Sequence, residues 1–289
     1  MIILLSLLFG LIIGSFINVV IHRLPLMIRS EWLKESFSLA SNFLDDPEEK
    51  RLLKNKMVPD ESAYNLAFPS SQCPTCGTKI RYKHNIPLIG FFLLRARCSD
   101  CNAKISPRYP LVEFLSAILT FLCINEFGWT LHGASAALLS YVLISLACID
   151  YESGLLPDSI TMPFLWVGLI INYFDTITSF EKAFWGALIG YLILWAVYQA
   201  FKLLTKKEGM GFGDFKMLAM LGAWLGIVSI PTIIMISSIS CLFVVGILSF
   251  KGRDLAQPIR FGPFLAFAGF AVIFWGEELN KLYLNGVIS

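Results

Sequence analysis

Four cysteines and three aspartates are the residues of this sequence whose types and spacing could do chemistry. The aspartates, Asp150, Asp158 and Asp214, each border a long apolar run. A carboxylate beside a membrane segment is costly unless it has a partner or a function. The four cysteines share a polar region in the first half of the chain, and they are Cys73, Cys76, Cys98 and Cys101. These two groups are the candidate catalytic and metal sites.

The four cysteines form two Cys-x2-Cys pairs with 21 residues between them. Each pair makes a tight turn that directs two thiolates at one ion, and two such turns complete a tetrahedral Zn²⁺ site. Four protein ligands leave no position for water, so we expect the zinc to be structural rather than catalytic. The other three cysteines, Cys123, Cys148 and Cys241, lie in apolar runs and are interpreted as small buried side chains.

Asp150 and Asp214 are the candidate catalytic pair. Asp150 follows an apolar run at the expected carboxyl end of a helix, where the helix macrodipole disfavours an anion. Asp214 ends the stretch "GMGFGD", whose glycines permit unusual backbone angles and close approach by an extended substrate. Two carboxyl groups that meet in a low dielectric share a proton. The anion can then activate water while the acid polarises a scissile carbonyl, which predicts an aspartic peptidase.

Structural roles compete with catalysis at these acids. Asp158, in "PDSIT", is well placed to cap the amino end of a helix, and we expect it to do so. Asp214 is a candidate cap as well. Lys216 could bind or neutralise an acid, but it is expected to extend its ammonium group to the membrane interface. Asp150 has no such structural explanation, which favours a function for it.

Other catalytic motifs are absent from the sequence. None of its three histidines begins a His-Glu-x-x-His motif, and no Gly-x-Ser-x-Gly elbow occurs, which disfavours metallopeptidases and serine peptidases. "GMGFG" precedes an apolar run and follows no strand, so it is weak as a nucleotide loop. No basic cluster interleaved with aromatic residues indicates nucleic acid as a partner.

Composition places the chain in the lipid bilayer. Of its 289 residues, 56% are hydrophobic and 15% are charged, with a mean hydropathy of +0.68. Soluble domains average about 45–50% apolar residues and about 25% charged residues. We therefore expect an all-α polytopic membrane protein of about eight transmembrane helices. The expected spans are residues 1–21, 109–126, 131–149, 159–175, 182–203, 215–230, 232–250 and 259–276, with a helix break at Pro231.

The charges predict the orientation of these spans. The first run has no basic residue before its apolar stretch, so it is interpreted as an uncleaved helix rather than a signal peptide. With the N-terminus outside, only Lys182 and Lys281 of the 23 Lys and Arg residues fall on the outer side. The polar segment 22–108 then lies in the cytoplasm, and its stretch 30–44 is either an amphipathic helix along the membrane or a solvated linker.

At these residues the chain resembles the bacterial type IV prepilin peptidases, which are leader peptidases and N-methyltransferases. Beside the four cysteines and the two aspartates, the resemblance rests on "GSFINVVIHRLP", "NIPLIGFFLLRARC", "ISPRYPLVEF", "IDYESGLLPD" and "GFGDFKM". The family's two catalytic aspartates correspond to Asp150 and Asp214. The second of them stands in the Gly-x-Gly-Asp motif that presenilin-type proteases share.

The resemblance implies a substrate and a methyl donor. Prepilins and pseudopilins of type IV pilus and type II secretion systems carry a short basic leader, which would be cut after a glycine at the cytoplasmic face of the bacterial inner membrane. The resemblance also implies methylation of the new N-terminus by S-adenosylmethionine, with participation of the zinc loop.

Three parts of the chain follow from this interpretation: a first transmembrane helix (1–21), a cytoplasmic zinc-loop domain (22–108) and a transmembrane peptidase core (109–289). Two alternatives remain. A presenilin-like protease with other substrates would not need the zinc loop. An ion- or proton-coupled transporter would place its acids near the middle of the membrane, whereas both aspartates fall at the inner ends of spans.

Overall fold

The computed structural model describes residues 2–44, 46–57, 65–250 and 259–288, with side chains up to residue 281. Regular structure within these ranges is helical, and extended pairing there is limited to two isolated bridges in the cysteine loop. The elements are α1 (Ile2–Ser41), α2 (Pro47–Met57), η1 (Tyr82–His84), α3 (Ile89–Leu93), α4 (Arg108–Phe127), α5 (Leu131–Ser153), α6 (Asp158–Tyr173), α7 (Phe180–Thr205), α8 (Phe212–Leu225), α9 (Ser229–Phe250) and α10 (Gly262–Ile288).

Six of these helices are long and apolar enough to cross a membrane, which makes the chain a multi-pass membrane protein. They are α1, α4, α5, α7, α9 and α10. The predicted fold class is therefore confirmed, but the count of eight spans is not. The fourth and sixth predicted spans form helices, α6 and α8, of only 16 and 14 residues.

The helix break expected at Pro231 lies earlier in the chain. α8 ends at Leu225, and Gly226 follows it with a φ of +81°. Pro231 is the third residue of α9, where its missing N–H costs little because the first amides of a helix have no partner within the helix. The glycine therefore ends one helix, and the proline is tolerated at the start of the next.

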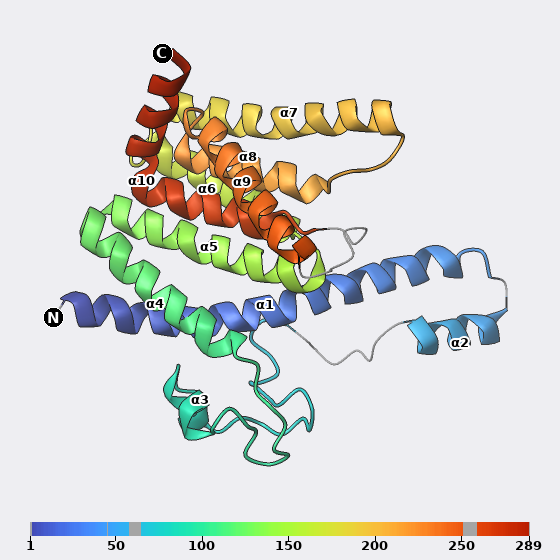
Figure 1. The fold of residues 1–289 in the computed structure, drawn as a ribbon. Coiled ribbons are helices and arrows are strands. Elements are labelled where there is room, and N and C mark those ends of the chain that lie inside the picture. The colour runs from blue at the N-terminus through green and yellow to red at the C-terminus, as the bar shows by residue number, and fades with distance from the viewer. Residues whose placement is uncertain (1, 45, 58–64, 251–258, 289) are drawn as a thin grey trace. The chain divides into compact units, whose positions relative to one another are not determined.

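The first helix is longer than the sequence suggested. α1 continues to Ser41, through Pro25, and has 40 residues. The stretch expected to be either a separate amphipathic helix or a linker is, up to Ser41, an extension of this first helix (Figure 1). A run of good helix formers after Pro25, including leucine, methionine, glutamate and lysine, accounts for the continuation.

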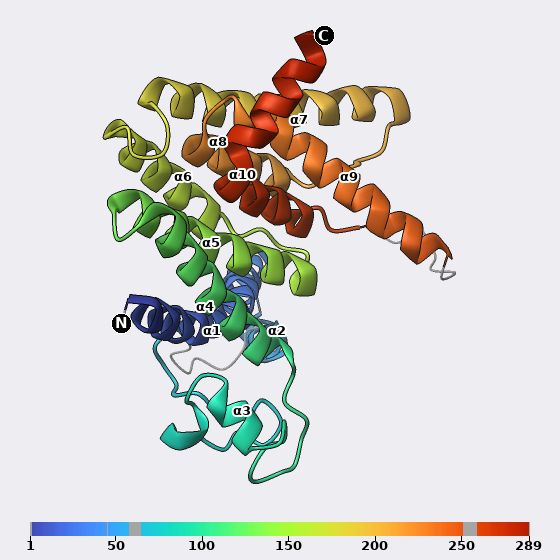
Figure 2. The ribbon, with the colours of Figure 1, turned by 60° about the vertical axis from the view of Figure 1, so that its left-hand side comes forward.

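The chain divides into two compact units, one made of Met1–Gly10 and Ser116–Ser289 and the other of Leu11–Leu115. In the first unit α8 packs against α6 and α7, and α10 packs against α5 and α9. Both ribbon views show α7 and α8 side by side (Figures 1 and 2). The side chains of α8 are buried on every face from Phe215 to Trp224, apart from half-buried Lys216.

Two glycines allow α7 and α8 to cross in backbone contact. A Cβ added at Gly186 of α7 would lie 2.4 Å from the carbonyl oxygen of Gly222 in α8, and one added at Gly222 would lie 2.1 Å from that of Gly186. Gly190, one turn further along α7, meets the carbonyl of Leu218 in the same way. In lipid no hydrophobic effect drives helices together. Small residues spaced four apart allow the two backbones to approach closely and gain van der Waals contact instead.

A buried amide fixes the carboxyl end of α8. Asn172 Nδ2 donates to the carbonyl oxygens of Ala223 and Trp224, each at 2.9 Å. Its Oδ1 accepts from the amides of Ile177 and Thr178, each at 3.1 Å. Because Asn172 is fully buried near the end of α6, it satisfies carbonyl groups that a helix end leaves without an intrahelical partner.

In the second unit, buried polar residues of α1 hold the loop that leads to the cysteines. Arg23 is 6% exposed and donates to the carbonyl oxygens of Asn65, Leu66 and Pro69. Asn18, also buried, donates to the carbonyl of Tyr109 at 3.0 Å. Two polar side chains of the segment "GSFINVVIHRLP", Asn18 and Arg23, thus donate hydrogen bonds to backbone groups of the same unit.

Candidate functional site

Asp150 lies near the carboxyl end of α5 and is 6% exposed. Its Oδ2 accepts a hydrogen bond of 3.0 Å from the amide of Gly262, the first residue of α10. The guanidinium of Arg260 donates to the backbone carbonyls of Asp150, at 2.9 Å, and of Tyr151. The macrodipole of α5 disfavours the Asp150 carboxylate at the carboxyl end of that helix. The carboxylate instead contacts the amino end of α10, where the macrodipole favours an anion.

Arg260 and Gly262 are the two residues of this site that the sequence analysis missed. A Cβ added at Gly262 would lie 2.6 Å from Asp150 Oδ2, so any larger residue there would displace the carboxylate. The one available signal was "RFGPF", where a proline follows Gly262 at the start of an apolar run, as is typical of a helix start. That signal predicts where a helix starts, but it does not predict that the helix start contacts Asp150.

Asp214 lies in the first turn of α8 and is 8% exposed. The cap position is taken by Gly211, with no side-chain capping hydrogen bond, so the alternative role of Asp214 as a cap is wrong. A Cβ added at Gly211 would lie 3.9 Å from Asp214 Oδ2. The carboxyl group of Asp214 therefore lies over the backbone that precedes it, at ordinary van der Waals distance.

The structure brings Asp150 and Asp214 together within one unit of the chain. Their carboxyl groups are close enough to interact electrostatically, although the residues are 64 positions apart in the sequence. Both are buried acids at the ends of helices. Two carboxyl groups in such a setting can share one proton, which is the arrangement that activates water.

Asp158 does not cap α6, contrary to expectation. It is the first residue of the helix, the cap position belongs to Pro157, and no side-chain capping bond is made there. Both carboxylate oxygens instead accept from Lys216 Nζ, at 2.8 and 2.6 Å. Lys216, expected to extend to the interface, therefore joins the amino-terminal part of α8 to the first residue of α6. A nearby full charge attracts the carboxylate more strongly than unpaired amides do.

The four cysteines lie at two turns of the same design. In each turn the amide of the residue after the second cysteine, Gly77 or Asn102, donates to the carbonyl of the first cysteine. Both residues have a positive φ, of 71° and 57°. In each turn the amide of the first cysteine also donates to the carbonyl five residues on. One turn geometry is thus used twice, as the spacing predicted.

The four sulfur atoms fit a tetrahedral metal ion. All lie within 4.8 Å of one another, and Cys73 Sγ is 3.8 Å from Cys101 Sγ. A tetrahedron with metal–sulfur bonds of about 2.3 Å has edges of about 3.8 Å. Backbone hydrogen bonds from Cys76 and Thr75 lower the pKa of the Cys73 thiol to about 6, which favours the thiolate that binds metals. These four residues can hold a metal ion.

Two models of known protein families match the chain, one in each half. Residues 8–127 match the bacterial peptidase A24 N-terminal domain, and residues 137–246 match the type IV leader peptidase family. No solved structure matches the chain.

Curated relatives that carry the name prepilin leader peptidase/N-methyltransferase include the following three. The protein of Stutzerimonas stutzeri is 44% identical over 281 residues, covering 97% of this chain and 93% of the relative. That of Aeromonas hydrophila is 45% identical over 284 residues, with coverage of 97% and 93%. That of Pseudomonas aeruginosa is 42% identical over 281 residues, with coverage of 97% and 92%.

Fold and site define a multi-pass membrane protein with paired buried aspartates and a four-cysteine cluster. The chain belongs to the type IV leader peptidase family. The expected resemblance is thereby confirmed, and the matches do not favour the presenilin-like or transporter alternatives.

Proposed function

We propose that this chain cleaves the leader peptides of prepilins or pseudopilins with Asp150 and Asp214 as its catalytic pair. The observation that carries the proposal is the electrostatic interaction between two buried carboxyl groups of distant helices. One of them is oriented by the amide of Gly262. The curated relatives' name supports the substrate class.

The chemistry is hydrolysis by activated water. The ionised carboxylate takes a proton from water, and the resulting hydroxide attacks the carbonyl carbon of the scissile peptide. The protonated carboxyl group donates its hydrogen bond to the carbonyl oxygen, where negative charge develops. The carbon–nitrogen bond then breaks, and the carboxyl group that took the first proton returns it to the leaving amine. Each carboxyl group thereby ends in the form that it held at the start, and the pair is ready for another cycle.

We propose that zinc is the metal of the cysteine cluster and that it is structural, because its four ligands leave no open position. The relatives' name supports a second activity, methylation of the new N-terminal amine. S-adenosylmethionine is the methyl donor proposed for that step. The cluster would hold the cysteine loop in shape for methyl transfer, and it takes no part in peptide hydrolysis.

The proposed place of the chain is the bacterial inner membrane, with its N-terminus outside and both aspartates at the cytoplasmic face. The distribution of Lys and Arg supports this orientation. The division into residues 1–21, 22–108 and 109–289 stays a prediction.

The experiment is cleavage of a purified prepilin in detergent by the wild type, Asp150→Asn, Asp214→Asn and Asp158→Asn. Loss of an acid–base group should lower the rate of the first two variants by about 100-fold or more. Asp158→Asn should stay within about threefold of the wild type, because it removes a partly exposed ion pair.

Thermal unfolding of each variant serves as the folding control. The proposal is wrong if either Asp150→Asn or Asp214→Asn, folded as the wild type is, cleaves at the wild-type rate. Mass spectrometry of the product reports the second activity, since methylation adds one methyl group to the new N-terminus.

A further inference from the structure

The loop of residues 206–211 joins α7 to α8 and leads directly to Asp214. α7 ends at Thr205, and the next residue, Lys206, has a left-handed backbone conformation with a φ of +56°. Two glycines, Gly209 and Gly211, follow in the loop. Glycine has more conformational freedom to lose on folding than any other residue. A loop of this composition holds one shape only if other contacts fix it.

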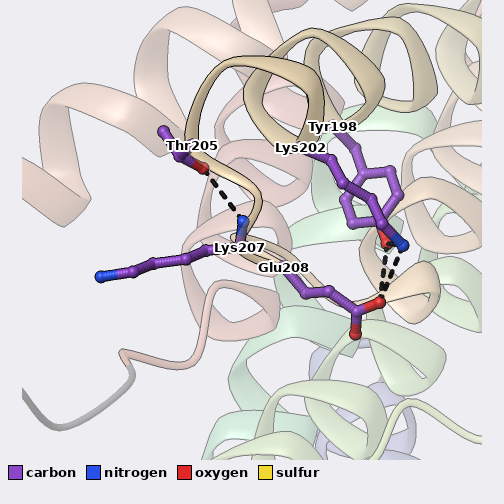
Figure 3. A network of polar contacts seen from close by, with 5 residues as sticks. All are labelled: Tyr198, Lys202, Thr205, Lys207 and Glu208. Carbon is purple, nitrogen blue, oxygen red and sulfur yellow. Dashed lines mark hydrogen bonds and ion pairs between the residues drawn. The ribbon is translucent and has the colours of Figure 1, made fainter.

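Glu208 provides the first such contact. Its Oε1 accepts from Lys202 Nζ at 2.9 Å and from the hydroxyl of Tyr198 at 3.3 Å. Lys202 Nζ also donates to the Tyr198 hydroxyl at 3.2 Å, which closes a triangle of three side chains. Figure 3 shows Glu208 reaching from the loop toward these two residues of α7.

Tyr198 continues the contact to the first turn of α8. It is 4% exposed, and its ring centroid lies 5.3 Å from that of Phe212 and 5.7 Å from that of Phe215. These two phenylalanines flank Gly213 and Asp214 in the sequence. One tyrosine thus contacts the loop through its hydroxyl group and both sides of the acid through its ring.

A third contact lies between these two. A Cβ added at Gly209 would lie 2.7 Å from the ring of Phe201, one turn along α7 from Tyr198. The backbone of the loop is therefore pressed against α7 at the residue after Glu208. Together the three contacts join the loop to α7 from Glu208 to Phe212.

We propose that Tyr198, Lys202 and Glu208 are positioning residues for peptide cleavage, because they fix the loop that presents Asp214 to Asp150. They act through Asp214 rather than directly on the substrate or on the attacking water. The inference rests on the proposed catalytic role of Asp214.

The state of Glu208 suits this role. The hydrogen bond and charge of Lys202 hold the pKa of Glu208 below its ordinary value of 4.5. The carboxylate is therefore charged at neutral pH, and the contact persists under the conditions of a cleavage assay. An exposed ion pair alone contributes little, whereas hydrogen bonds to a charged group contribute more.

Two variants test the inference, with one matched control. Tyr198→Phe removes the hydroxyl and keeps the ring, and Glu208→Gln removes the charge. The control is Lys207→Gln, because the Lys207 side chain points away from the network and only its amide bonds to Thr205 (Figure 3). We expect kcat for prepilin cleavage to fall about three- to tenfold in the two test variants. KM and the melting temperature should stay close to those of the control.

Exchange of the two charges tests the positioning role separately from a merely structural one, through its effect on kcat. Lys202→Glu and Glu208→Lys each place like charges together, and each should lower kcat by at least as much as Glu208→Gln. The double variant restores opposite charges and should recover most of the lost kcat.

Asp214→Asn is assayed beside these variants. If it is inactive while Tyr198→Phe and Glu208→Gln cleave as the control does, this inference is wrong and the proposed function stands. Failure of the double variant to recover activity also overturns the inference. If Asp214→Asn cleaves at the wild-type rate, the catalytic pair is wrong, and the positioning role falls with it.

Discussion

In the cysteine cluster all four side chains come from 29 consecutive residues, whereas the groups around the two aspartates come from helices far apart in the chain. Each cysteine pair is shaped by hydrogen bonds within its own turn. Asp150, by contrast, is oriented by Gly262, 112 residues further on. The first site consists of two local turns that a metal ion could join, and the second depends on a correctly packed helical unit. The two sites should therefore fail under different perturbations.

Removal of a metal ligand gives the largest expected effect. Cys73→Ser should abolish metal binding by the cluster, because a structural zinc ion with four thiolate ligands contributes about 10–16 kcal/mol to folding of its site. Elemental analysis of the purified protein should fall from about one zinc per chain to nearly none. Leader cleavage should stay within about threefold, since both aspartates lie in the other unit.

Cys241→Ser is the control for this substitution, because Cys241 lies in α9 outside the cluster. Equal zinc contents in the two variants would show that the four cysteines do not form the metal site.

Substitution of one glycine should have the converse effect. In Gly262→Ala the added methyl group would lie 2.6 Å from Asp150 Oδ2, so the carboxylate must move. Misplacement of a catalytic group by about 1 Å costs about 100-fold in rate. Zinc content should not change. Gly246→Ala is the matched control, because nothing lies within 4 Å of the added carbon there. Equal cleavage rates in the two variants would contradict the role of Gly262.

Loss of a buried amide should destabilise the helical unit. Asn172→Ala leaves two carbonyl groups and two amides without their side-chain partner. We expect the free energy of unfolding to fall by about 2 kcal/mol. Thermal unfolding in detergent measures this, with exposed Asn42→Ala as the control. The prediction fails if both variants melt at the same temperature.

The smallest effect is expected at the pair of Asp158 and Lys216. Lys216→Met removes an ion pair whose side chains are 28% and 61% exposed, for lysine and aspartate respectively. Such pairs contribute about 0.2–1 kcal/mol. A double-mutant cycle with Asp158→Asn measures the coupling between the two residues. A coupling energy of several kcal/mol would mean that this contact, too, is part of the long-range framework of the aspartates.

The same contrast explains what the sequence could predict. The cysteine turns depend on neighbours within five residues, so the spacing of Cys73, Cys76, Cys98 and Cys101 was sufficient to predict the cluster. Asp150 was recognised because an anion is disfavoured at the carboxyl end of a helix, and Asp214 because it ends a glycine-rich stretch that borders an apolar run. The partners of Asp150 were not predictable, because no local pattern says which helix start will meet it.

The errors at the helix level have the same origin. Asp158 is a suitable cap by local rules, but Lys216, 58 residues away, offers a stronger partner. Each of the eight predicted spans overlaps a helix, but hydropathy alone did not show that α6 and α8 are shorter than a full span. α8 can be short because its neighbours, rather than lipid, cover nearly all of it.

The closeness of the four sulfur atoms has a consequence for redox chemistry. Thiols 3.8 Å apart need little movement to reach the S–S distance of about 2.05 Å, and the lowered pKa of Cys73 favours the thiolate form that oxidants attack. A bound metal ion occupies the sulfur lone pairs that an oxidant would attack. In an oxidising environment the metal-free loop would therefore be trapped in disulfide form, and its recovery would require a reductant before any metal.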